Sequence, residues 1–233
     1  MSRIAVVAGA NRGIGREPAR QFAAASDTVY LTARHHDAAV KTAADLQPGI
    51  AGPGQLIAHQ LDVTDPGSIT RLGQTLHDRH GHLDVLVNSA GILYDTWQNA
   101  ASANLAVVQQ AIDTNLFGAW RTTITLLPLL RASRHPRIVN VSSEGGSLTH
   151  MGGGIPAYRI SKTALNALTR MLADELRHDR ILVNAVCPGW VATNMGGAGG
   201  RPAADGAAST RWAADLPDSG PTGGFYRDGH PLP

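Results

Sequence analysis

Disulfide bonds and long apolar segments are both missing from this chain of 233 residues. Its one cysteine, Cys187, cannot form an internal disulfide, which excludes the small secreted folds that depend on such bonds. The apolar opening, Ile4 to Ala8, is far shorter than the roughly 20 residues of a membrane-spanning helix and is too short for a signal segment. We therefore expect a cytoplasmic protein that does not act at a membrane.

Clustered positive charge and lysine are also scarce. The 20 Lys and Arg residues nearly balance the 18 Asp and Glu residues and form no basic block, so we expect no nucleic-acid partner. Only Lys41 and Lys162 are lysines. A lysine kept in a chain that otherwise uses arginine indicates a need for a compact ammonium whose pKa can be tuned.

The length and the balance of apolar and charged residues indicate one globular α/β domain spanning residues 1–233. Apolar β-branched segments alternate with helical patterns, which is typical of βαβ units. We predict a single doubly wound Rossmann-type domain, with a parallel sheet of about seven strands and helices on both faces. The expected strands are 3–8, 28–33, 55–61, 83–87, 137–142, 181–186 and 224–227, and the expected helices are 14–25, 37–46, 66–80, 103–132 and 157–179.

Residues 196–209 are rich in glycine and alanine and interrupt this alternation after the sixth strand. The carboxyl end of a parallel sheet is where α/β proteins bind ligands, so we predict a mobile substrate loop there. A plain linker is the alternative.

Three histidines, His77, His80 and His82, form the one pattern that suggests a metal site. No cysteine or further carboxylate completes a ligand shell around them. We therefore predict a solvated helix end and no bound metal.

Gly9, Gly13 and Gly15 follow the first predicted strand with the spacing GxxxGxG. At such a turn the backbone approaches a pyrophosphate, and the N–H groups of the next helix face it. A tight bend without a ligand is the alternative, but the position directly after a strand favours dinucleotide binding.

The residues after the second strand favour NADP(H) over NAD. An NAD site usually offers an acid to the ribose about 20 residues after the glycines, whereas this strand ends in Arg34. Arg34 and Arg12 are suited to bind a 2'-phosphate with bidentate charged hydrogen bonds. Two ordinary surface arginines are the alternative.

Two further strand ends carry residues that a nucleotide would meet. Asp62, followed by Val63, is placed to reach the adenine edge, although an acid there can equally cap a turn. Asn88, Ala90 and Gly91 follow the fourth strand, where small residues would let the cofactor ribose approach; an ordinary turn is the alternative.

Tyr158 and Lys162 stand four residues apart, a spacing that places both on one face of a helix. A phenol has a pKa of about 10, and lowering it to about 7 requires roughly 4 kcal/mol. One unit charge about 4 Å away supplies about that much at an effective dielectric constant near 20. The pair therefore suggests a tyrosine tuned for proton transfer, although the same spacing occurs on many solvated helices.

These segments, in this order, resemble the short-chain dehydrogenase/reductase family over nearly the whole chain. Ala8 to Gly15 is similar to TGxxxGxG, Asn88 to Gly91 to NNAG, Ile138 to Ser143 to the serine strand, and Cys187 to Val191 with Thr193 to the PG motif. Asn115 stands where the family has a helical asparagine. The closing segment, Gly223 to Gly229, looks most like the NADPH-dependent carbonyl reductases.

The resemblance implies a catalytic tetrad of Ser143, Tyr158, Lys162 and Asn115. Tyr158 would act as general acid or base and Ser143 would orient the carbonyl. Lys162 would hold the ribose and tune Tyr158, while Asn115 would support a water relay. Ser142 is the rival serine, but Ser143 is the one that fits the family's SxxG spacing.

Residues and resemblance together predict an NADP(H) site. Its members are Gly9, Asn11, Arg12, Gly13, Ile14, Gly15, Arg34, Asp62, Val63, Asn88, Ala90, Gly91, Tyr158, Lys162, Pro188, Gly189, Val191 and Thr193. Ala8 and Ser89 replace the family's usual threonine and second asparagine, which removes side-chain hydrogen bonds from the cofactor loop. We expect Tyr94, Trp97, His150, Met151 and Trp190 either to line a substrate pocket or to be packing residues.

The predicted function is reduction of a small or medium, partly apolar ketone or aldehyde by NADPH, or the reverse oxidation. A 3-oxoacyl thioester reductase is the second enzyme hypothesis, and a nonenzymatic NADP(H)-binding regulator is a third. The helices at 103–132 and 157–179 resemble those that form homodimers and homotetramers in the family, although carbonyl reductase relatives are also monomers.

Overall fold

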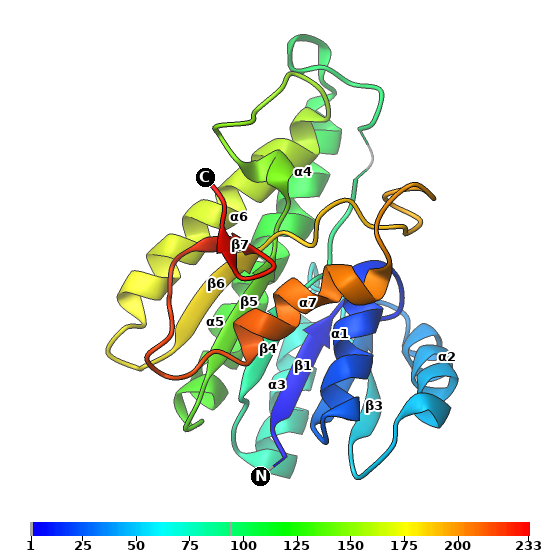
Figure 1. Ribbon diagram of the computed structural model, residues 1–233, viewed down its shortest axis with the longest axis vertical. Coiled ribbons are helices and arrows are strands. Elements are labelled where there is room, and N and C mark those ends of the chain that lie inside the picture. Colours follow the sequence, from blue (N-terminus) through cyan, green and yellow to red (C-terminus); the bar gives the residue numbers. More distant parts are fainter. Residues whose placement is uncertain (1, 94) are drawn as a thin grey trace.

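The predicted alternation folds into one sheet covered by helices on both faces in the computed structural model, which describes residues 2–93 and 95–233 (Figure 1). The strands are β1 (Ile4–Ala8), β2 (Thr28–Ala33), β3 (Gln55–Gln60), β4 (Val85–Asn88), β5 (Arg137–Val141), β6 (Leu182–Val186), β7 (Phe225–Arg227) and β8 (His230–Pro231). Their order in the sheet is β3-β2-β1-β4-β5-β6-β7-β8. Strands β1 to β7 are parallel, and β8 is antiparallel to β7.

Seven α-helices accompany the sheet in the described part of the chain. They are α1 (Gly13–Ala24), α2 (His36–Leu46), α3 (Pro66–His80), α4 (Leu105–Ile112), α5 (Ala119–Arg131), α6 (Pro156–Glu175) and α7 (Ala203–Ala214). A π-helical segment, η3 (Asp113–Gly118), joins α4 to α5, and short 3-10 turns lie at η1 (Gln47–Gly49), η2 (Ala100–Ser102) and η4 (Glu144–Gly146). Of the helices described, none has the length and apolar character that a bilayer crossing requires.

Two hydrophobic cores lie on the two faces of the sheet, because successive side chains of a strand point to opposite sides. In β1, Ile4, Val6 and Ala8 join a core with α3, α5 and α6. Ala5 and Val7 join the other core, with α1, α2 and α7. The whole of β1 is therefore buried, as expected for a central parallel strand.

The predicted fold class is confirmed, and most strands and helices lie close to their predicted limits. The predicted 103–132 helix contains the π-helical segment η3. The strand β8 was missed because it has only two residues, one of them a proline.

The predicted loop at 196–209 is wrong for residues 203–209, which form the first half of α7. The loop was expected because residues 196–209 as a whole are rich in glycine and alanine, but from Ala203 onward alanine, the best helix former, predominates. A Cβ at Gly206 would come within 2.6 Å of Val191 Cγ2, so this glycine permits close packing of α7. Only residues 196–202 remain as a loop, and their mobility stays a prediction.

Candidate active site

The glycine turn after β1 packs tightly against the end of β4. Gly9 has a φ of +72°, and a Cβ there would lie 2.7 Å from Ala90 Cα. A Cβ at Gly15 would lie 2.4 Å from the Gly9 carbonyl oxygen. Glycine is therefore required at both positions to bring the N-terminus of α1 against the carboxyl end of the sheet, where N–H groups favour an anion.

Arg12 and Arg34 lie in the segments that follow the neighbouring parallel strands β1 and β2. Arg12 is the exposed N-cap residue of α1, and Arg34 follows β2. Arg34 Nε lies 4.0 Å from Asp62 Oδ2, at the end of β3. The structure thus pairs Arg34 with Asp62 at the same sheet edge as the glycine turn.

Asp62 caps a turn, which was the alternative to its adenine-binding role. Its Oδ1 accepts hydrogen bonds from the Thr64 backbone N–H at 2.9 Å and from the Thr64 hydroxyl at 2.7 Å. Partial burial raises the pKa of Asp62, but these hydrogen bonds and the Arg34 charge outweigh it and hold the pKa below its usual value. Asp62 is therefore an anionic partner for Arg34.

Asn88 points into the protein rather than toward the glycine turn. Its Nδ2 donates to Asn140 Oδ1 at 2.8 Å and to Thr123 Oγ1 at 3.2 Å, and Asn140 Nδ2 donates to Thr169 Oγ1 at 2.9 Å. This buried chain of amides and hydroxyls ties β4 and β5 to α5 and α6. The Asn88 side chain therefore has a structural role in the described protein, and the place of Asn88 among the cofactor-binding residues stays a prediction.

Ala90 and Gly91 are the members of that segment that border the site. Ala90 contacts Gly9, as described above. A Cβ placed on Gly91 would lie 3.4 Å from Asn115 Oδ1 and 3.6 Å from Lys162 Nζ. The end of β4 therefore connects the glycine turn with two of the predicted catalytic residues.

Tyr158 and Lys162 lie on one face of α6, as predicted, with Lys162 Nζ 5.7 Å from the centre of the Tyr158 ring. Lys162 is buried and donates to the Val141 carbonyl oxygen at 2.8 Å. Burial lowers the pKa of Lys162 to about 8, against a smaller opposing influence of Cys187. The ammonium is therefore held in a low-dielectric site at the cost of its hydration.

The expected lowering of the Tyr158 pKa is wrong for this structure. Burial raises the pKa of Tyr158, and the opposing hydrogen bond from Ser143 is the smaller influence. Loss of hydration disfavours the charged phenolate more than the Ser143 hydroxyl favours it, and Cys187 adds a small influence in the same direction as burial. Tyr158 is therefore a protonated phenol near neutral pH.

Ser143 lies beside Tyr158, whereas Ser142 does not. Ser143 Oγ accepts from the Gly145 N–H at 3.1 Å, and a Cβ on Gly145 would lie 3.4 Å from this oxygen and 3.8 Å from Tyr158 Cε1. Ser142 is buried, and its hydroxyl donates to the Lys162 carbonyl at 3.4 Å. Of the two serines, Ser143 is the one available to a ligand.

Gly146 explains why the serine loop can approach α6. A Cβ at this position would come within 2.7 Å of the Lys162 carbonyl carbon. The SxxG spacing noted in the sequence thus has a packing reason, because only glycine lets the loop that carries Ser143 lie this close to the helix that carries Tyr158.

Asn115 occupies the π-helical segment η3 and is buried. Its Oδ1 accepts from the Ile92 N–H at 2.8 Å, and its Nδ2 donates to the Ile92 carbonyl at 3.0 Å and to Ser161 Oγ at 2.9 Å. The Ser161 hydroxyl in turn donates to the Tyr158 carbonyl at 2.8 Å. A π-bulge often marks a functional position, and here it lets one asparagine join the end of β4 to α6.

The PG segment after β6 closes over the N-terminus of α1. Gly189 has a φ of +78°, and Val191 is buried. A Cβ on Gly206 of α7 would lie close to Val191, to Ile14 and to the Pro188 carbonyl. This packing brings Pro188 and Val191 close to Ile14 at the start of α1, and their roles in cofactor binding stay predictions.

Thr193 has a different environment from the rest of this segment. Its hydroxyl accepts from the Gly196 N–H at 3.0 Å, and its carbonyl accepts from the Gly197 N–H at 2.8 Å. The Thr193 side chain therefore shapes the 196–202 loop. Its role in cofactor binding stays a prediction.

The described side chains that we expected either to line a substrate pocket or to pack are exposed. Trp97 is 75% exposed, Trp190 is 66% exposed and Met151 is 39% exposed, and His150 is also exposed. Trp190 Nε1 donates to the Gly196 carbonyl at 2.6 Å, which lays the indole along the 196–202 loop. Tyr94, also predicted to line the pocket, lies outside the described residues.

Two residues with contacts in the site, Asp95 and Arg227, were missed from the sequence. Asp95 is fully buried, and its Oδ2 accepts from the Ala157 N–H at 2.7 Å at the start of α6. Arg227 of β7 donates to Glu144, the neighbour of Ser143, at 2.6 Å. No local pattern reveals these contacts, because the partners are 62 and 83 residues apart.

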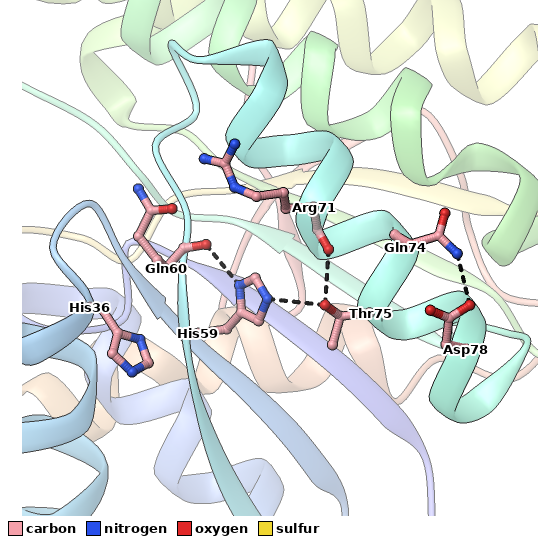
Figure 2. Close-up of a pocket in the computed structure, with 7 residues that line it drawn as sticks. All are labelled: His36, His59, Gln60, Arg71, Gln74, Thr75 and Asp78. Atoms are coloured by element: carbon pink, nitrogen blue, oxygen red, sulfur yellow. Dashed lines mark hydrogen bonds between the residues drawn. The ribbon is translucent and has the colours of Figure 1, made fainter.

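A separate hollow of about 430 Å³ lies between α2, β3 and α3 (Figure 2). His59 projects into it, with Nδ1 2.7 Å from the Gln60 carbonyl oxygen and Nε2 3.4 Å from Thr75 Oγ1. Burial lowers the pKa of His59. None of the predicted catalytic residues lines this hollow, so it is distinct from the candidate active site.

The three histidines near the end of α3 have ordinary structural environments. His77 is exposed, and His80 Nε2 lies 2.9 Å from the Tyr30 hydroxyl. His82 Nε2 lies 3.4 Å from Asp84 Oδ2. Across residues 2–93 and 95–233, no three His, Cys, Asp or Glu side chains are grouped as metal ligands would be.

Comparisons with known proteins agree with this geometry. A family model described as short chain dehydrogenase matches residues 3–201. Carbonyl reductase (NADPH) 3 of Mus musculus is 34% identical over 277 residues, covering 97% of this chain and 96% of that protein. (+)-Neomenthol dehydrogenase of Arabidopsis thaliana is 34% identical over 251 residues, covering 83% of this chain and 84% of that protein.

A solved structure, the NADPH-bound carbonyl reductase from chicken fatty liver, has a TM-score of 0.87 and 28% identity, covering 99% of this chain and 98% of that one. The family match extends from β1 through the glycine turn, the serine strand and the Tyr-Lys helix to the PG segment. The chain belongs to the short-chain dehydrogenase family of oxidoreductases.

Proposed function

We propose that the protein reduces a ketone or aldehyde to an alcohol with NADPH, or catalyses the reverse reaction, through Ser143, Tyr158, Lys162 and Asn115. The observation that carries the proposal is the convergence of these residues from β5, α6 and η3 at one edge of the sheet. Ser143 and Tyr158 meet beside Gly145, and Lys162 and Asn115 meet beside Gly91.

The glycine turn fits a dinucleotide. Gly9 and Gly15 leave no room for a Cβ, so the backbone at the N-terminus of α1 is free of side chains where a pyrophosphate would approach. Arg12 and Arg34 would hold a 2'-phosphate, and Ala90 and Gly91 would border the ribose. NADPH supplies a hydride when it is bound.

Tyr158 is the proton donor in this proposal. Burial raises the pKa of Tyr158, so the phenol carries its proton near neutral pH and can give it to a carbonyl oxygen that is gaining charge. Ser143 adds a hydrogen bond to the same oxygen. This protonation state suits carbonyl reduction better than alcohol oxidation, in which tyrosine must accept the proton.

Lys162 and Asn115 support the donor. The pKa of Lys162, lowered by burial to about 8, leaves the side chain mainly charged at pH 7. As an ammonium it stabilises negative charge that forms on Tyr158 during proton transfer. Asn115 fixes the end of β4 against α6 and would support the route by which the proton is replaced.

The substrate in this proposal is small or medium in size and partly apolar. Trp97, Trp190 and Met151 present exposed apolar surface, and we expect them to border the bound substrate. Exposed aromatic side chains of this kind bind apolar ligands and orient them.

Consumption of NADPH across a panel of ketones and aldehydes tests the function, with acyl thioesters and NADH in parallel. We expect turnover of apolar ketones or aldehydes with NADPH and slower turnover with NADH. No NADPH consumption with any carbonyl compound would contradict the proposal, and exclusive use of acyl thioesters would replace the substrate class.

Arg34→Leu tests the assignment of the 2'-phosphate. We expect the KM for NADPH to rise about tenfold or more, because hydrogen bonds to a charged group are worth about 1.5–3 kcal/mol, while the KM for NADH changes little. Arg71→Leu is the matched control, because Arg71 is similarly exposed and also pairs with an aspartate, Asp65 at 3.4 Å. Equal effects on the two cofactors would contradict the assignment.

A further inference from the structure

The turn between β7 and β8 places two charged side chains at the carboxyl end of the sheet. Asp228 has a φ of +51° and Gly229 a φ of +80°, as the central residues of a type I′ hairpin turn require, and Arg227 pairs with His230 across it. The Cys187 N–H donates to the Tyr226 carbonyl at 2.8 Å, which fixes this hairpin beside the end of β6. Arg227 and Asp228 therefore reach the site from a rigid turn.

Arg227 contacts both the serine loop and the PG segment. Its Nη2 donates to Glu144 Oε2 at 2.6 Å and to Cys187 Sγ at 3.2 Å. Cys187 Sγ also accepts from the backbone N–H groups of Glu144 at 3.2 Å and of Gly189 at 3.3 Å. One guanidinium and one sulfur thus join the residue that follows Ser143 to the residues that open the PG segment.

Asp228 contacts the loop at 196–202 and α7. Its Oδ2 lies 2.8 Å from Arg201 Nη1, and its backbone N–H donates to Ser209 Oγ at 2.8 Å. The Arg201 N–H donates to the Trp190 carbonyl at 2.8 Å, so Arg201 also anchors the segment that carries this tryptophan. Two adjacent residues therefore hold three loops that border the candidate active site.

We propose that Arg227 and Asp228 form a positioning pair, in which Arg227 holds the Ser143 loop against the PG segment while Asp228 holds the 196–202 loop. The proposal rests on the assigned role of Ser143. Ser143 is followed directly by Glu144, whose carboxylate and N–H are anchored through Arg227 and Cys187, so the direction of the Ser143 hydroxyl depends on these contacts. A guanidinium suits this position because its Nη2 carries two N–H donors and reaches both Glu144 Oε2 and Cys187 Sγ.

The test compares Arg227→Met, Glu144→Gln and the double variant with the wild type. We expect each single variant to lower kcat about fivefold to twentyfold and to leave the Kd for NADPH within about twofold, because Arg227 contacts the serine loop rather than the glycine turn. The double variant should be no worse than the poorer single variant, since both changes act on the same contact between Arg227 and Glu144. Glu144 is half-exposed, so Glu144→Gln is expected to fold even if Arg227→Met does not.

Hydrogen exchange of residues 144–147 gives a readout that needs no turnover. We expect faster exchange in both single variants, because these N–H groups bond within the serine loop and to Cys187. Arg131→Met is the matched control: it removes a similarly exposed pair, Arg131 to Asp179 at 2.9 Å, at the opposite edge of the sheet, and should change neither readout.

The outcomes separate this proposal from the proposed function. If Arg227→Met and Glu144→Gln lower kcat no more than the Arg131→Met control does, and exchange at residues 144–147 is unchanged, the positioning role is overturned. Carbonyl reduction by the wild type would still support the proposed function in that case. Additive effects of the two single changes would also overturn the positioning role. The opposite result is also informative. If exchange at residues 144–147 is faster in the variants but the wild type reduces no carbonyl compound, Arg227 anchors the serine loop and the proposed function is rejected.

Discussion

Tyr158→Phe is expected to lower kcat by about a thousandfold, the middle of the range for loss of a general acid, which corresponds to about 4 kcal/mol in the barrier. The variant keeps the partly buried ring and removes only the hydroxyl that meets Ser143. The Kd for NADPH should therefore stay within a few-fold of the wild type. Steady-state kinetics with the best carbonyl substrate and a fluorescence titration with NADPH measure the two quantities.

Tyr226→Phe is the matched control for this substitution. Tyr226 lies on β7 and packs against Trp212, with ring centres 4.8 Å apart, away from the proposed proton donor. We expect its kcat to equal that of the wild type within about twofold. A Tyr158→Phe variant that keeps more than a tenth of the wild-type kcat would remove the tyrosine from the mechanism.

Lys162→Met is expected to stabilise the folded protein at pH 7 while abolishing most of its activity. The buried ammonium has a pKa of about 8 in place of its ordinary 10.5, a difference of about 2.5 that corresponds to about 3 kcal/mol of destabilisation when both states are protonated. The variant also loses the hydrogen bond to the Val141 carbonyl, which destabilises its folded state by about 1 kcal/mol. The net gain in the free energy of unfolding is about 2 kcal/mol.

The pH dependence of this gain has a definite sign. Between pH 8 and 10.5 the unfolded wild type binds more protons at Lys162 than the folded protein, so wild-type stability rises with pH in that window. The advantage of Lys162→Met should therefore be largest below pH 8 and shrink toward pH 10. Urea unfolding of both proteins without cofactor at pH 7 and pH 10 measures this difference.

Activity should move in the opposite direction from stability. We expect kcat/KM of Lys162→Met to fall at least a hundredfold, because no cation remains to stabilise charge on Tyr158. A stabilising substitution that removes activity is the mark of a residue kept for function. A variant that is less stable than the wild type at pH 7, or whose stability difference does not vary with pH, would contradict the burial of a charged lysine.

The architecture was largely predictable because its signals are local. Buried strands such as Ile4–Ala8 are continuous apolar segments, and the glycine turn that follows marks the first βα connection. The start of α7 was not predictable in the same way, because Gly206 is required by a contact with Val191 from another segment. The sequence alone does not distinguish a glycine that permits close packing of a helix from a glycine that marks a turn.

In the candidate site, too, features set by local sequence were predictable and features set by distant contacts were not. The sequence predicted Tyr158 and Lys162 on one helix face, and the structure has them there. Ser143 lies beside Tyr158 and Ser142 does not, while the catalytic role of Ser143 stays a prediction. The sequence did not anticipate the raised pKa of Tyr158, because burial depends on residues from several segments. The contact of Arg227 with Glu144 was hidden for the same reason, since it spans 83 residues and two strands.

Transfer of deuterium from NADPH labelled at C4 of the nicotinamide to a ketone tests the central claim most directly. We predict that one of the two C4-labelled forms places deuterium on the carbinol carbon of the product, as read by mass spectrometry, and that Tyr158→Phe lowers the rate of this transfer about a thousandfold. Absence of deuterium from the alcohol with either labelled form, or an unchanged rate in Tyr158→Phe, would contradict the account.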